Sequence, residues 1–318
     1  GWKHAILIIG AIVVMLPFYM MVSMSLKSQQ EIQSISGGLI GAQETQTFPV
    51  CVKTGYSEET CTMKPYQYNY WFAFEKAPIP RYLMNGVIVT LSIFIIQVLV
   101  ALPCAYALAK LRFYGREFVF SMVLFCLLIP VHGIALPLYV MLAQAGLVDT
   151  YSALILPWTI SVFGIFLMRQ FFMTVPDELI DAARMDGMGE YAIVWKVMLP
   201  TAIPALLAFA IFSVVAHWND YFWPRVVITG DRDLMTPPLG LRMFKSDMDG
   251  NEYGPMMAAA TVIVGLPTFF TSISPPSALT VVGRVIVKGA ACLHTYILFM
   301  QRVVFWSISN AYCRRIIS

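Results

Sequence analysis

Long apolar runs constrain this chain more than any other feature of its sequence. Six stretches are almost free of charged side chains and have about the 20 residues needed to cross the hydrocarbon core of a bilayer. They are residues 5–26, 82–109, 118–142, 151–168, 201–223 and 255–274. Because backbone polar groups find no water in lipid, such runs must be helices rather than open strands. The sequence therefore predicts an all-α membrane protein with about six transmembrane helices.

The composition agrees with a surface that mostly faces lipid. Charged residues make up 12% of the chain and hydrophobic residues 58%, whereas a typical soluble domain has roughly 25% charged residues. The run 5–26 is longer than the apolar core of a signal peptide, so we expect a retained helix. A net charge of +3 is too small to indicate a nucleic-acid partner. Neighbouring helices are expected to tolerate prolines inside the runs, among them Pro17, Pro103, Pro130 and Pro157.

The short loops predict the orientation of the helices. The loop 110–117 contains three basic residues, Lys110, Arg112 and Arg116, whereas the loop 143–150 contains no Lys or Arg. By the positive-inside rule, the first loop is cytoplasmic and the second is external. Alternation then gives the sides of the remaining segments: the N-terminus and residues 170–200 inside, residues 27–81 and 224–254 outside.

The external loop 27–81 contains Cys51 and Cys61, with nine residues between them. The outer side is oxidising, so a disulfide between these cysteines and two free thiols are both open. The six cysteines form no C-x-x-C pair, which argues against a zinc or thiol redox motif. The acidic run 247–252 does not complete a calcium loop, so no metal site is predicted.

The cytoplasmic segment 170–200 has the pattern of a helix, a turn and a second helix. Thr174 is expected to cap the first helix, and the first turn contains Pro176, Asp177 and Glu178, which suit a helix N-terminus. Gly187 can supply the left-handed residue that ends this helix. The second helix leads through residues 191–198 to Pro200 and the fifth apolar run.

One face of the first helix is expected to be shallow. Leu179, Ala182, Ala183 and Asp186 share that face at helical spacing, and the adjacent alanines would let a partner protein come close. We interpret the segment as an element that docks on another protein and is rigidly joined to a membrane helix. The alternative is an ordinary amphipathic connector without a partner.

The spacing of this segment resembles a known signature. Asp181-Ala182-Ala183, then Gly187 after three residues, then Val197-x-Leu199-Pro200 after nine more, resembles the "EAA" signature of bacterial binding-protein-dependent ABC importer permeases. Asp181 stands where the family usually has Glu. Further motifs look like the carbohydrate-uptake branch, which includes the smaller maltose permease subunit and the glycerol-phosphate permeases: 176–179 (PDEL), Asp186-Gly187, Asn69-Tyr70, 218–221 (WNDY) and 236–241 (TPPLGL).

The similarity covers about residues 1–270, which are expected to form the transmembrane domain. Family members normally finish soon after the sixth helix, and residues 271–318 look unlike that ending. We expect this segment to contain the end of helix six and a basic tail.

The resemblance implies the function of a permease subunit in the bacterial inner membrane. A cytoplasmic coupling helix between helices four and five would dock on the ATPase through Glu178, Asp181, Ala182, Ala183, Asp186 and Gly187. The implied partners are a second permease subunit, two ATPase subunits and a soluble substrate-binding protein. This chain has no phosphate-binding G-x-x-x-x-G-K-[ST] loop, so ATP and Mg are expected on the ATPase subunits and no cofactor here. The implied solute is an oligosaccharide, such as an acidic oligouronide, or a polyol or glycerol phosphate.

Polar residues at or near membrane depth are candidates for a solute pathway. They are Asn85, His132, His217, Trp218, Asn219, Asp220 and Tyr221. Trp218 and Tyr221 could stack on a sugar ring, and the alternative for the whole set is a belt of interfacial residues bonded to backbone or headgroups.

Two other classes of protein are alternatives to the importer. An ion-gradient-driven secondary transporter predicts ionisable residues in mid-membrane and internal repeats. A membrane-embedded enzyme predicts clustered histidines or acids near one interface, or a catalytic motif. The apolar runs are almost free of acids, and neither repeats nor catalytic motifs are found. The sequence therefore favours a transport subunit that is not an enzyme.

Overall fold

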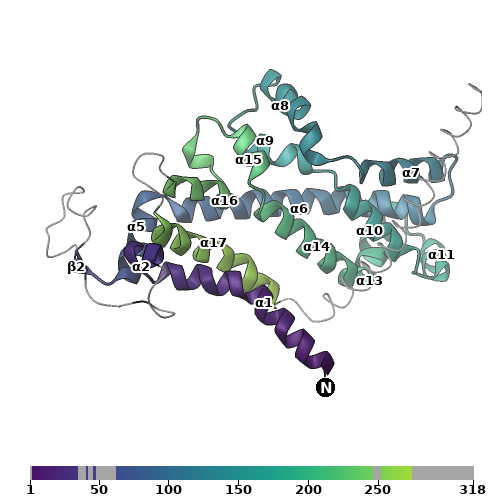
Figure 1. The fold of residues 1–318 in the computed structure, drawn as a ribbon. Helices are drawn as coiled ribbons and strands as arrows, with labels where there is room; N and C mark the ends of the chain where they lie inside the picture. Colours follow the sequence, from purple (N-terminus) through teal and green to yellow (C-terminus); the bar gives the residue numbers. More distant parts are fainter. Residues whose placement is uncertain (1, 35–40, 42–45, 48–61, 246–251, 274–318) are drawn as a thin grey trace, which may run out of the picture. The chain divides into compact units, whose positions relative to one another are not determined.

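The computed structural model describes residues 2–34, 41, 46–47, 62–245 and 252–273. Nearly all regular structure in these residues is helical (Figure 1). The exception is a pair of two-residue antiparallel strands, β1 (Gln46–Thr47) and β2 (Thr62–Met63), in which Gln46 lies opposite Met63. The prediction of an all-helical chain is therefore confirmed over the described residues. Cys51 and Cys61 lie outside them, as does the expected tail beyond residue 273.

The chain divides into two compact units, each built from segments that are far apart in the sequence. The first unit contains Gly1–Phe94, Val131–Thr159 and Ser213–Ile273. The second contains Ile95–Pro130, Ile160–Phe212 and Ser274–Ser318, of which the last segment lies outside the described residues. The long helix α6 (Ile79–Lys110) contributes its first half to one unit and its second half to the other.

In the first unit, helix α17 packs along α1 and α5 (Figure 1). One buried cluster contains Tyr82, Phe244 and Ala258, and another contains Leu154, Trp223 and Val227. Besides the first half of α6 and the end of α14 (Ile203–Trp218), the elements are α1 (Trp2–Ser25), α2 (Gln29–Ser34), α5 (Pro65–Lys76), η1 (Val131–Ile134), α8 (Ala135–Gln144), α9 (Tyr151–Ile155), η2 (Leu156–Trp158), α15 (Phe222–Val227), η4 (Arg232–Leu234), α16 (Pro237–Gly240), η5 (Leu241–Phe244) and α17 (Tyr253–Ile273).

In the second unit, the main core cluster includes Tyr106, Phe172 and Met198. Its elements, besides parts of α6 and α14, are α7 (Arg116–Cys126), α10 (Val162–Phe172), α11 (Asp177–Met185), α12 (Glu190–Ile193), the π-helical turn η3 (Val194–Met198) and α13 (Leu199–Thr201). Arg169 on α10 is buried, and its Nε donates a hydrogen bond to the carbonyl oxygen of Leu108 at 3.1 Å. This bond joins the end of α6 to α10.

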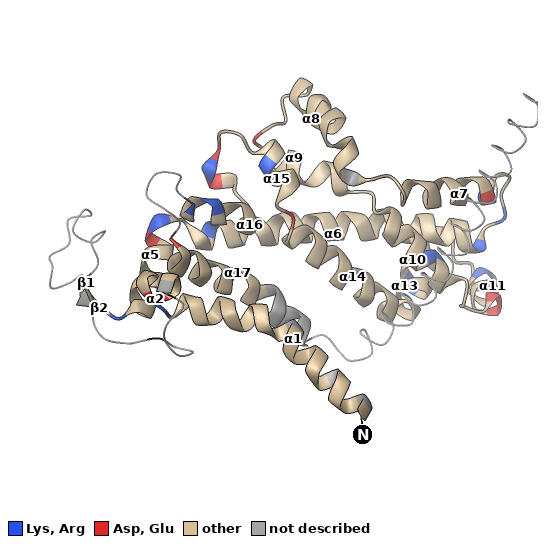
Figure 2. Cartoon of the chain, in the orientation of Figure 1, with Lys and Arg blue, Asp and Glu red and all other residues tan. Residues whose placement is uncertain are grey.

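Charged residues lie mainly at helix ends and in the connecting segments, whereas the middle of α6 and all of α14 carry none (Figure 2). By length and composition, α6 and His4–Ser25 of α1 can each cross a membrane. Two bent helix pairs raise the number of candidate spans among the described residues to four. These helices expose many large apolar side chains, as expected for surfaces that face lipid.

Two of the predicted spans contain a break near a proline. Helix α7 ends at Cys126 and helical structure resumes at Val131, just after Pro130. Proline removes a backbone donor and disfavours a helical conformation in the residue before it, so the expected tolerance is wrong for Pro130. Pro157 lies in η2, inside the segment Tyr151–Trp158, and the 40° bend to Val162–Phe172 follows that segment. Pro17 and Pro103 lie inside α1 and α6.

The fifth predicted span begins with a sharp turn. The segments Glu190–Thr201 and Ile203–Trp218 meet at an angle of 85°. Ala202 lies between them, and Pro204 occupies the second position of α14. A proline there cannot donate to the carbonyl of Pro200, and its ring excludes a straight continuation. The connection from α13 to α14 is thus a sharp bend.

Candidate functional site

Helix α11 begins as its acidic first turn predicts, but not with the expected cap. Its N-cap is Pro176, which has extended φ and ψ of −59° and 140°. Thr174 instead donates its hydroxyl to the carbonyl oxygen of Phe171 at 2.7 Å, so the predicted Thr174 cap is wrong. Asp177 and Glu178 lie in the first turn, where carboxylates suit the exposed N–H groups and the helix dipole.

The end of α11 follows the prediction closely. Gly187 has φ of +78°, the left-handed conformation that glycine adopts without strain. The N–H of Met188 donates to the carbonyl of Ala183, and the N–H of Gly187 donates to that of Arg184, both at 3.0 Å. This pair of bonds is a Schellman motif, which ends the helix with its last carbonyls satisfied. The partly buried side chain of Met188 packs against the core cluster of the second unit.

The two faces of α11 differ sharply in exposure. Ile180 and Ala183 are 2% and 4% exposed, and both belong to the core cluster that contains Tyr106. Ala183 therefore packs against its own chain, and its assignment to a docking surface is corrected. The opposite face is open, and its most exposed apolar residue is Met185 at 84%. We call this exposed face the outer face of α11; its residues are Glu178, Leu179, Asp181, Ala182, Met185 and Asp186.

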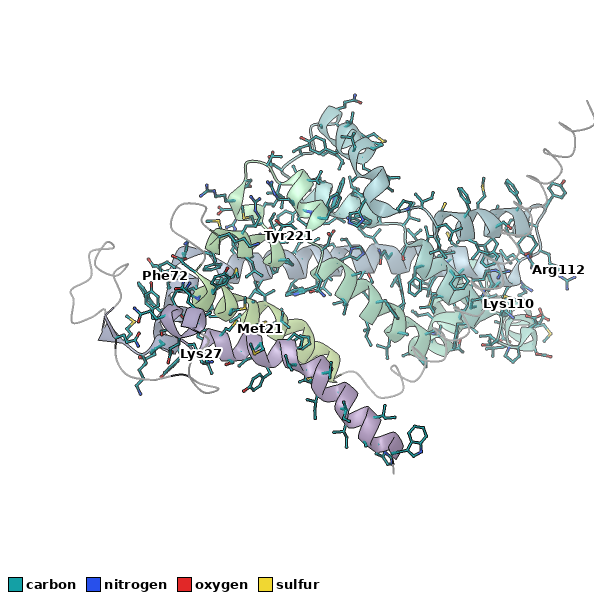
Figure 3. All side chains as sticks on the ribbon, in the orientation of Figure 1. Met21, Lys27, Phe72, Lys110, Arg112 and Tyr221 are labelled. Atoms are coloured by element: carbon teal, nitrogen blue, oxygen red, sulfur yellow. The ribbon has the colours of Figure 1, made fainter. Side chains whose placement is uncertain are left out.

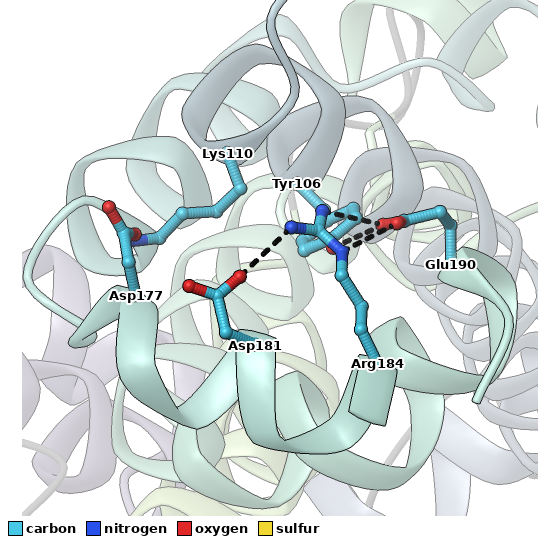
Figure 4. A network of polar contacts seen from close by, with 6 residues as sticks. All are labelled: Tyr106, Lys110, Asp177, Asp181, Arg184 and Glu190. Atoms are coloured by element: carbon cyan, nitrogen blue, oxygen red, sulfur yellow. Dashed lines mark hydrogen bonds and ion pairs between the residues drawn. The ribbon is translucent and has the colours of Figure 1, made fainter. Parts of the chain in front are cut away.

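A buried lysine holds the start of α11. The Nζ of Lys110, at the end of α6, donates to the carbonyl of Val175 at 2.6 Å and to the Oδ1 of Asp177 at 2.5 Å (Figure 4). The lysine side chain is 8% exposed and that of Asp177 is 77% exposed. The hydrogen bond from Lys110 and its positive charge lower the pKa of Asp177 below its ordinary value. A charge-assisted bond of this kind fixes the first turn of α11 to α6.

A second polar cluster holds the end of α11. Arg184 donates to both carboxylate oxygens of Glu190, at 2.8 and 3.3 Å, and to the Oδ1 of Asp181 at 3.2 Å. Glu190 also accepts a hydrogen bond from the hydroxyl of Tyr106 at 2.5 Å (Figure 4). Hydrogen bonds from Arg184 and Tyr106 lower the pKa of Glu190. The glutamate thus joins three helices, since Arg184 lies on α11, Tyr106 on α6 and Glu190 on α12.

A cavity of about 380 Å³ lies beside these contacts. Lys110 and Arg112, at the end of α6 and just after it, are labelled in Figure 3. The lining combines three cationic side chains with two carboxylates, which is a surface for polar rather than apolar contacts. The lining residues are Lys110, Leu111, Arg112, Asp177, Ile180, Asp181 and Arg184.

Two residues proposed for the solute pathway have packing roles in the first unit. Asn85 is buried; its Nδ2 donates to the carbonyls of Asp233 and Met235 at 2.7 and 3.0 Å, and its Oδ1 accepts from the hydroxyl of Tyr151 at 2.6 Å. Trp218 is also buried, and its Nε1 donates to the carbonyl of Ile263 at 3.2 Å. Both residues therefore agree with the alternative interpretation, in which they bond to the backbone and do not line a solute pathway. The indole of Trp218 is buried and so cannot stack on a sugar ring.

The other pathway candidates are more open. His132 is exposed, with its ring 4.5 Å from that of Phe222. His217 is half-buried, with its ring 5.8 Å from that of Trp158. Asp220 is half-buried and accepts a bond from the N–H of Trp223 at 3.2 Å. Asn219 and Tyr221 are exposed, and Tyr221 is labelled in Figure 3.

Several residues of the site were not predicted from the sequence. Met185 could have been found, because it lies three residues after Ala182 on the face opposite Ile180. Tyr106 and Glu190 gave no signal, since 84 positions separate them. The sequence marks Lys110 only as one of three basic residues in the loop 110–117.

Comparison with known proteins places this site in a family context. Residues 97–274 match the family described as "Binding-protein-dependent transport system inner membrane component". The chain is 38% identical over 180 residues to the arabinooligosaccharides transport system permease protein AraQ of Halalkalibacterium halodurans, a match that covers 57% of this chain and 64% of AraQ. It is 29% identical over 288 residues to the sn-glycerol-3-phosphate transport system permease protein UgpE of Yersinia enterocolitica, covering 90% of this chain and 94% of UgpE.

The fold is also similar to a solved structure. A chain in the crystal structure of a bacterial ABC transporter involved in the import of the acidic polysaccharide alginate superposes with a TM-score of 0.66 and 21% sequence identity. The superposition covers 86% of this chain and 95% of that chain. The family match spans more than half of the sequence and includes all of α11, Gly187 and α12. The chain belongs to the family of binding-protein-dependent transport system inner membrane components.

Proposed function

We propose that this chain is the transmembrane permease subunit of an ATP-driven ABC importer that takes up a carbohydrate. The observation that carries this proposal is α11, a short helix inside the family match whose inner face is packed and whose outer face is open. Its outer face presents three carboxylates around the exposed Met185. Such a surface suits docking on a separate protein.

The proposed complex contains a second permease subunit, two ATPase subunits that hold ATP and Mg, and a soluble substrate-binding protein. ATP binding closes the ATPase dimer, and α11 moves with the subunit on which it docks. The membrane helices then change from an inward-facing to an outward-facing arrangement. This is a rigid-body transition in which ATP binds one state better than the other.

The proposed topology has six spans, a cytoplasmic N-terminus and α11 on the cytoplasmic side of a bacterial inner membrane. Four candidate spans support it by length and composition. The broken segment α7–η1–α8 and the apolar helix α17 are the proposed third and sixth spans. The basic loop beside Lys110 favours the inner side for the end of α6.

The proposed solute is an oligosaccharide, including an acidic one, or a polyol or glycerol phosphate. The names of AraQ and UgpE and the alginate importer support this range. The exposed and half-buried polar residues of the first unit are the proposed solute contacts: His132, His217, Asn219, Asp220 and Tyr221. Identifying the ligand of the cognate binding protein by mass spectrometry would choose among these solutes.

A photo-crosslinking experiment tests the docking proposal. A photoreactive amino acid at Met185 should crosslink to the ATPase subunit when the complex is expressed in membranes. Met122 on α7 is the matched control, because it is an exposed methionine in the same unit that the proposed topology places against lipid. A Met185 derivative that reacts with no ATPase would contradict the proposal. Solute uptake driven by an ion gradient in vesicles without the ATPase would instead support the secondary transporter.

A further inference from the structure

Two residues on one face of α6 contact opposite ends of α11. Tyr106 and Lys110 are four residues apart, so their side chains project from the same face one turn apart. Lys110 bonds to Val175 and Asp177 at the start of α11, whereas Tyr106 bonds to Glu190, which holds Arg184 at the end of α11. Figure 4 shows Lys110 beside Asp177 at the start of α11, and Tyr106 beside Glu190 and Arg184 towards its end.

Apolar contacts also join α11 to α6, beside the polar cavity. Ile180 and Ala183 of α11 lie in one buried cluster with Leu102, Ala105 and Tyr106 of α6. The hydrophobic effect is non-directional, so these apolar contacts define the orientation of α11 less sharply than hydrogen bonds do. Hydrogen bonds are directional, and the two anchors fix both ends of α11 against α6.

We infer that α6 receives the movement of α11, and that Tyr106 and Lys110 are the positioning residues that transmit it. The inference rests on the proposed docking of α11 on an ATPase. The covalent route from α11 runs through α12 and α13 and then turns by 85° before α14. The bonds to α6 provide a second route that contains no bend. Loss of the anchors would leave the outer face of α11 intact while α6 no longer follows it.

The test measures solute transport and ATP hydrolysis together in proteoliposomes that contain the complete transporter. Tyr106→Phe removes the hydroxyl that reaches Glu190 and keeps the buried ring. Lys110→Met removes the ammonium group and keeps a similar apolar stem. For each variant we expect the ratio of solute transported to ATP hydrolysed to fall by roughly fivefold, within the range found for residues that couple distant sites. The double variant should fall further.

The control removes a tyrosine hydroxyl from an exposed position just after α6. Tyr114→Phe changes a fully exposed side chain that does not line the cavity, and it should retain the wild-type ratio. Crosslinking from Met185 to the ATPase should persist in the Tyr106 and Lys110 variants, because the docking face is unchanged.

Three results would overturn the inference. The first is a wild-type transport ratio in the double variant. The second is loss of crosslinking from Met185 in Tyr106→Phe, which would assign the residue to docking rather than to transmission. The third is a wild-type complex in which α11 contacts no ATPase, and this result alone would also remove the proposed function. Because Tyr106→Phe deletes one oxygen, it keeps the test valid if Lys110→Met does not fold.

Discussion

The guanidinium carbon of Arg169 lies 3.6 Å from the centre of the Phe120 ring. Arg169 belongs to α10 and Phe120 to α7, and the same arginine donates to the carbonyl of Leu108 on α6. A cation over an aromatic face is attracted by the negative charge of the ring's π-system, and the attraction strengthens when water is excluded. The buried arginine therefore joins three helices of the second unit.

Replacing this arginine should weaken the second unit. Arg169→Met removes the cation–π contact and the bond to Leu108, and we expect a loss of about 2–4 kcal/mol of stability. Arg169→Lys keeps a charge but loses the planar group that stacks on Phe120, so its loss should be smaller, about 1–2 kcal/mol. The measurement is thermal unfolding in detergent. Arg112→Met, at an exposed position, should leave the midpoint nearly unchanged; an equal loss there would contradict the account.

Gly187 should not tolerate a β-branched residue. Its φ is +78°, and an added Cβ would meet nothing within 4 Å, so the cost of Gly187→Val is backbone strain of about 1–2 kcal/mol. That strain should loosen the end of α11 and reduce transport several-fold. Faster hydrogen exchange at the amide of Met188, which bonds to Ala183, would report the loosening directly.

Gly189 provides the matched control for Gly187. A Cβ added at Gly189 would also meet nothing within 4 Å, but the φ and ψ of this residue are −71° and 156°, a region that valine readily adopts. Gly189→Val should therefore leave transport and the exchange of Met188 close to wild type. If both valine variants changed transport and Met188 exchange equally, the positive φ of Gly187 would not be the cause of the loss.

Acid should loosen the contact between Asp149 and the segment 229–231. Asp149 accepts bonds from the N–H and the hydroxyl of Thr229, both at 2.7 Å, and from the N–H of Gly230 at 3.2 Å. Partial burial raises the pKa of Asp149, but these hydrogen bonds outweigh it and hold the pKa below its ordinary value. A lowered pKa gives stability that is present at neutral pH and is lost as pH falls below about 4. The exchange of the Thr229 and Gly230 amides measures this change.

Asp149→Asn isolates the charge in this contact. Asp149 has φ of 58°, and asparagine also tolerates the left-handed conformation. The variant should exchange its Thr229 and Gly230 amides faster at pH 7 and lose the dependence on acid. Asp186→Asn, at an exposed position on α11, is the control and should change neither. If acid still accelerated the exchange of the Thr229 and Gly230 amides in Asp149→Asn, this explanation would be wrong.

Asn85 and Tyr151 should be energetically coupled. Asn85→Ala removes the amide that donates to the carbonyls of Asp233 and Met235, which costs about 1–3 kcal/mol. Tyr151→Phe removes the hydroxyl that donates to the Oδ1 of Asn85. A double-mutant cycle on thermal stability should give a coupling energy of about 0.5–3 kcal/mol. Asn219→Ala, on an exposed amide, should cost much less. Additive effects of Asn85→Ala and Tyr151→Phe would contradict a shared role.

Local rules predicted much of α11 and its surroundings. Interactions between residues close in sequence explain three features: the acidic first turn, the left-handed conformation of Gly187 and the helical structure of the apolar runs. The assignment of Ala183 to the docking surface is wrong, because Ala183 lies on the buried face of α11 with Ile180, three residues earlier. Pro130 lies in a break between helices, whereas Pro17, Pro103 and Pro157 lie in helical segments, because the outcome depends on whether neighbours satisfy the freed backbone groups.

The contacts that hold the site together could not be predicted. Lys110 and Asp177 are 67 positions apart, and Asn85 and Asp233 are 148 apart. The pattern of residues near each side chain does not indicate which distant residue it will contact. A buried polar group only has to be satisfied by something, so sequence alone marked Asn85 as unusual and left its role open between a pathway and a packing contact.

The 85° bend at Ala202 has a mechanical consequence. A push along the axis of the segment Glu190–Thr201 has almost no component along the axis of α14, so it cannot drive that helix like a piston. The same push acts at the end of α14 almost perpendicular to its length and exerts a torque. If α11 moves with an ATPase as proposed, α14 would therefore rotate about its end rather than translate along its axis.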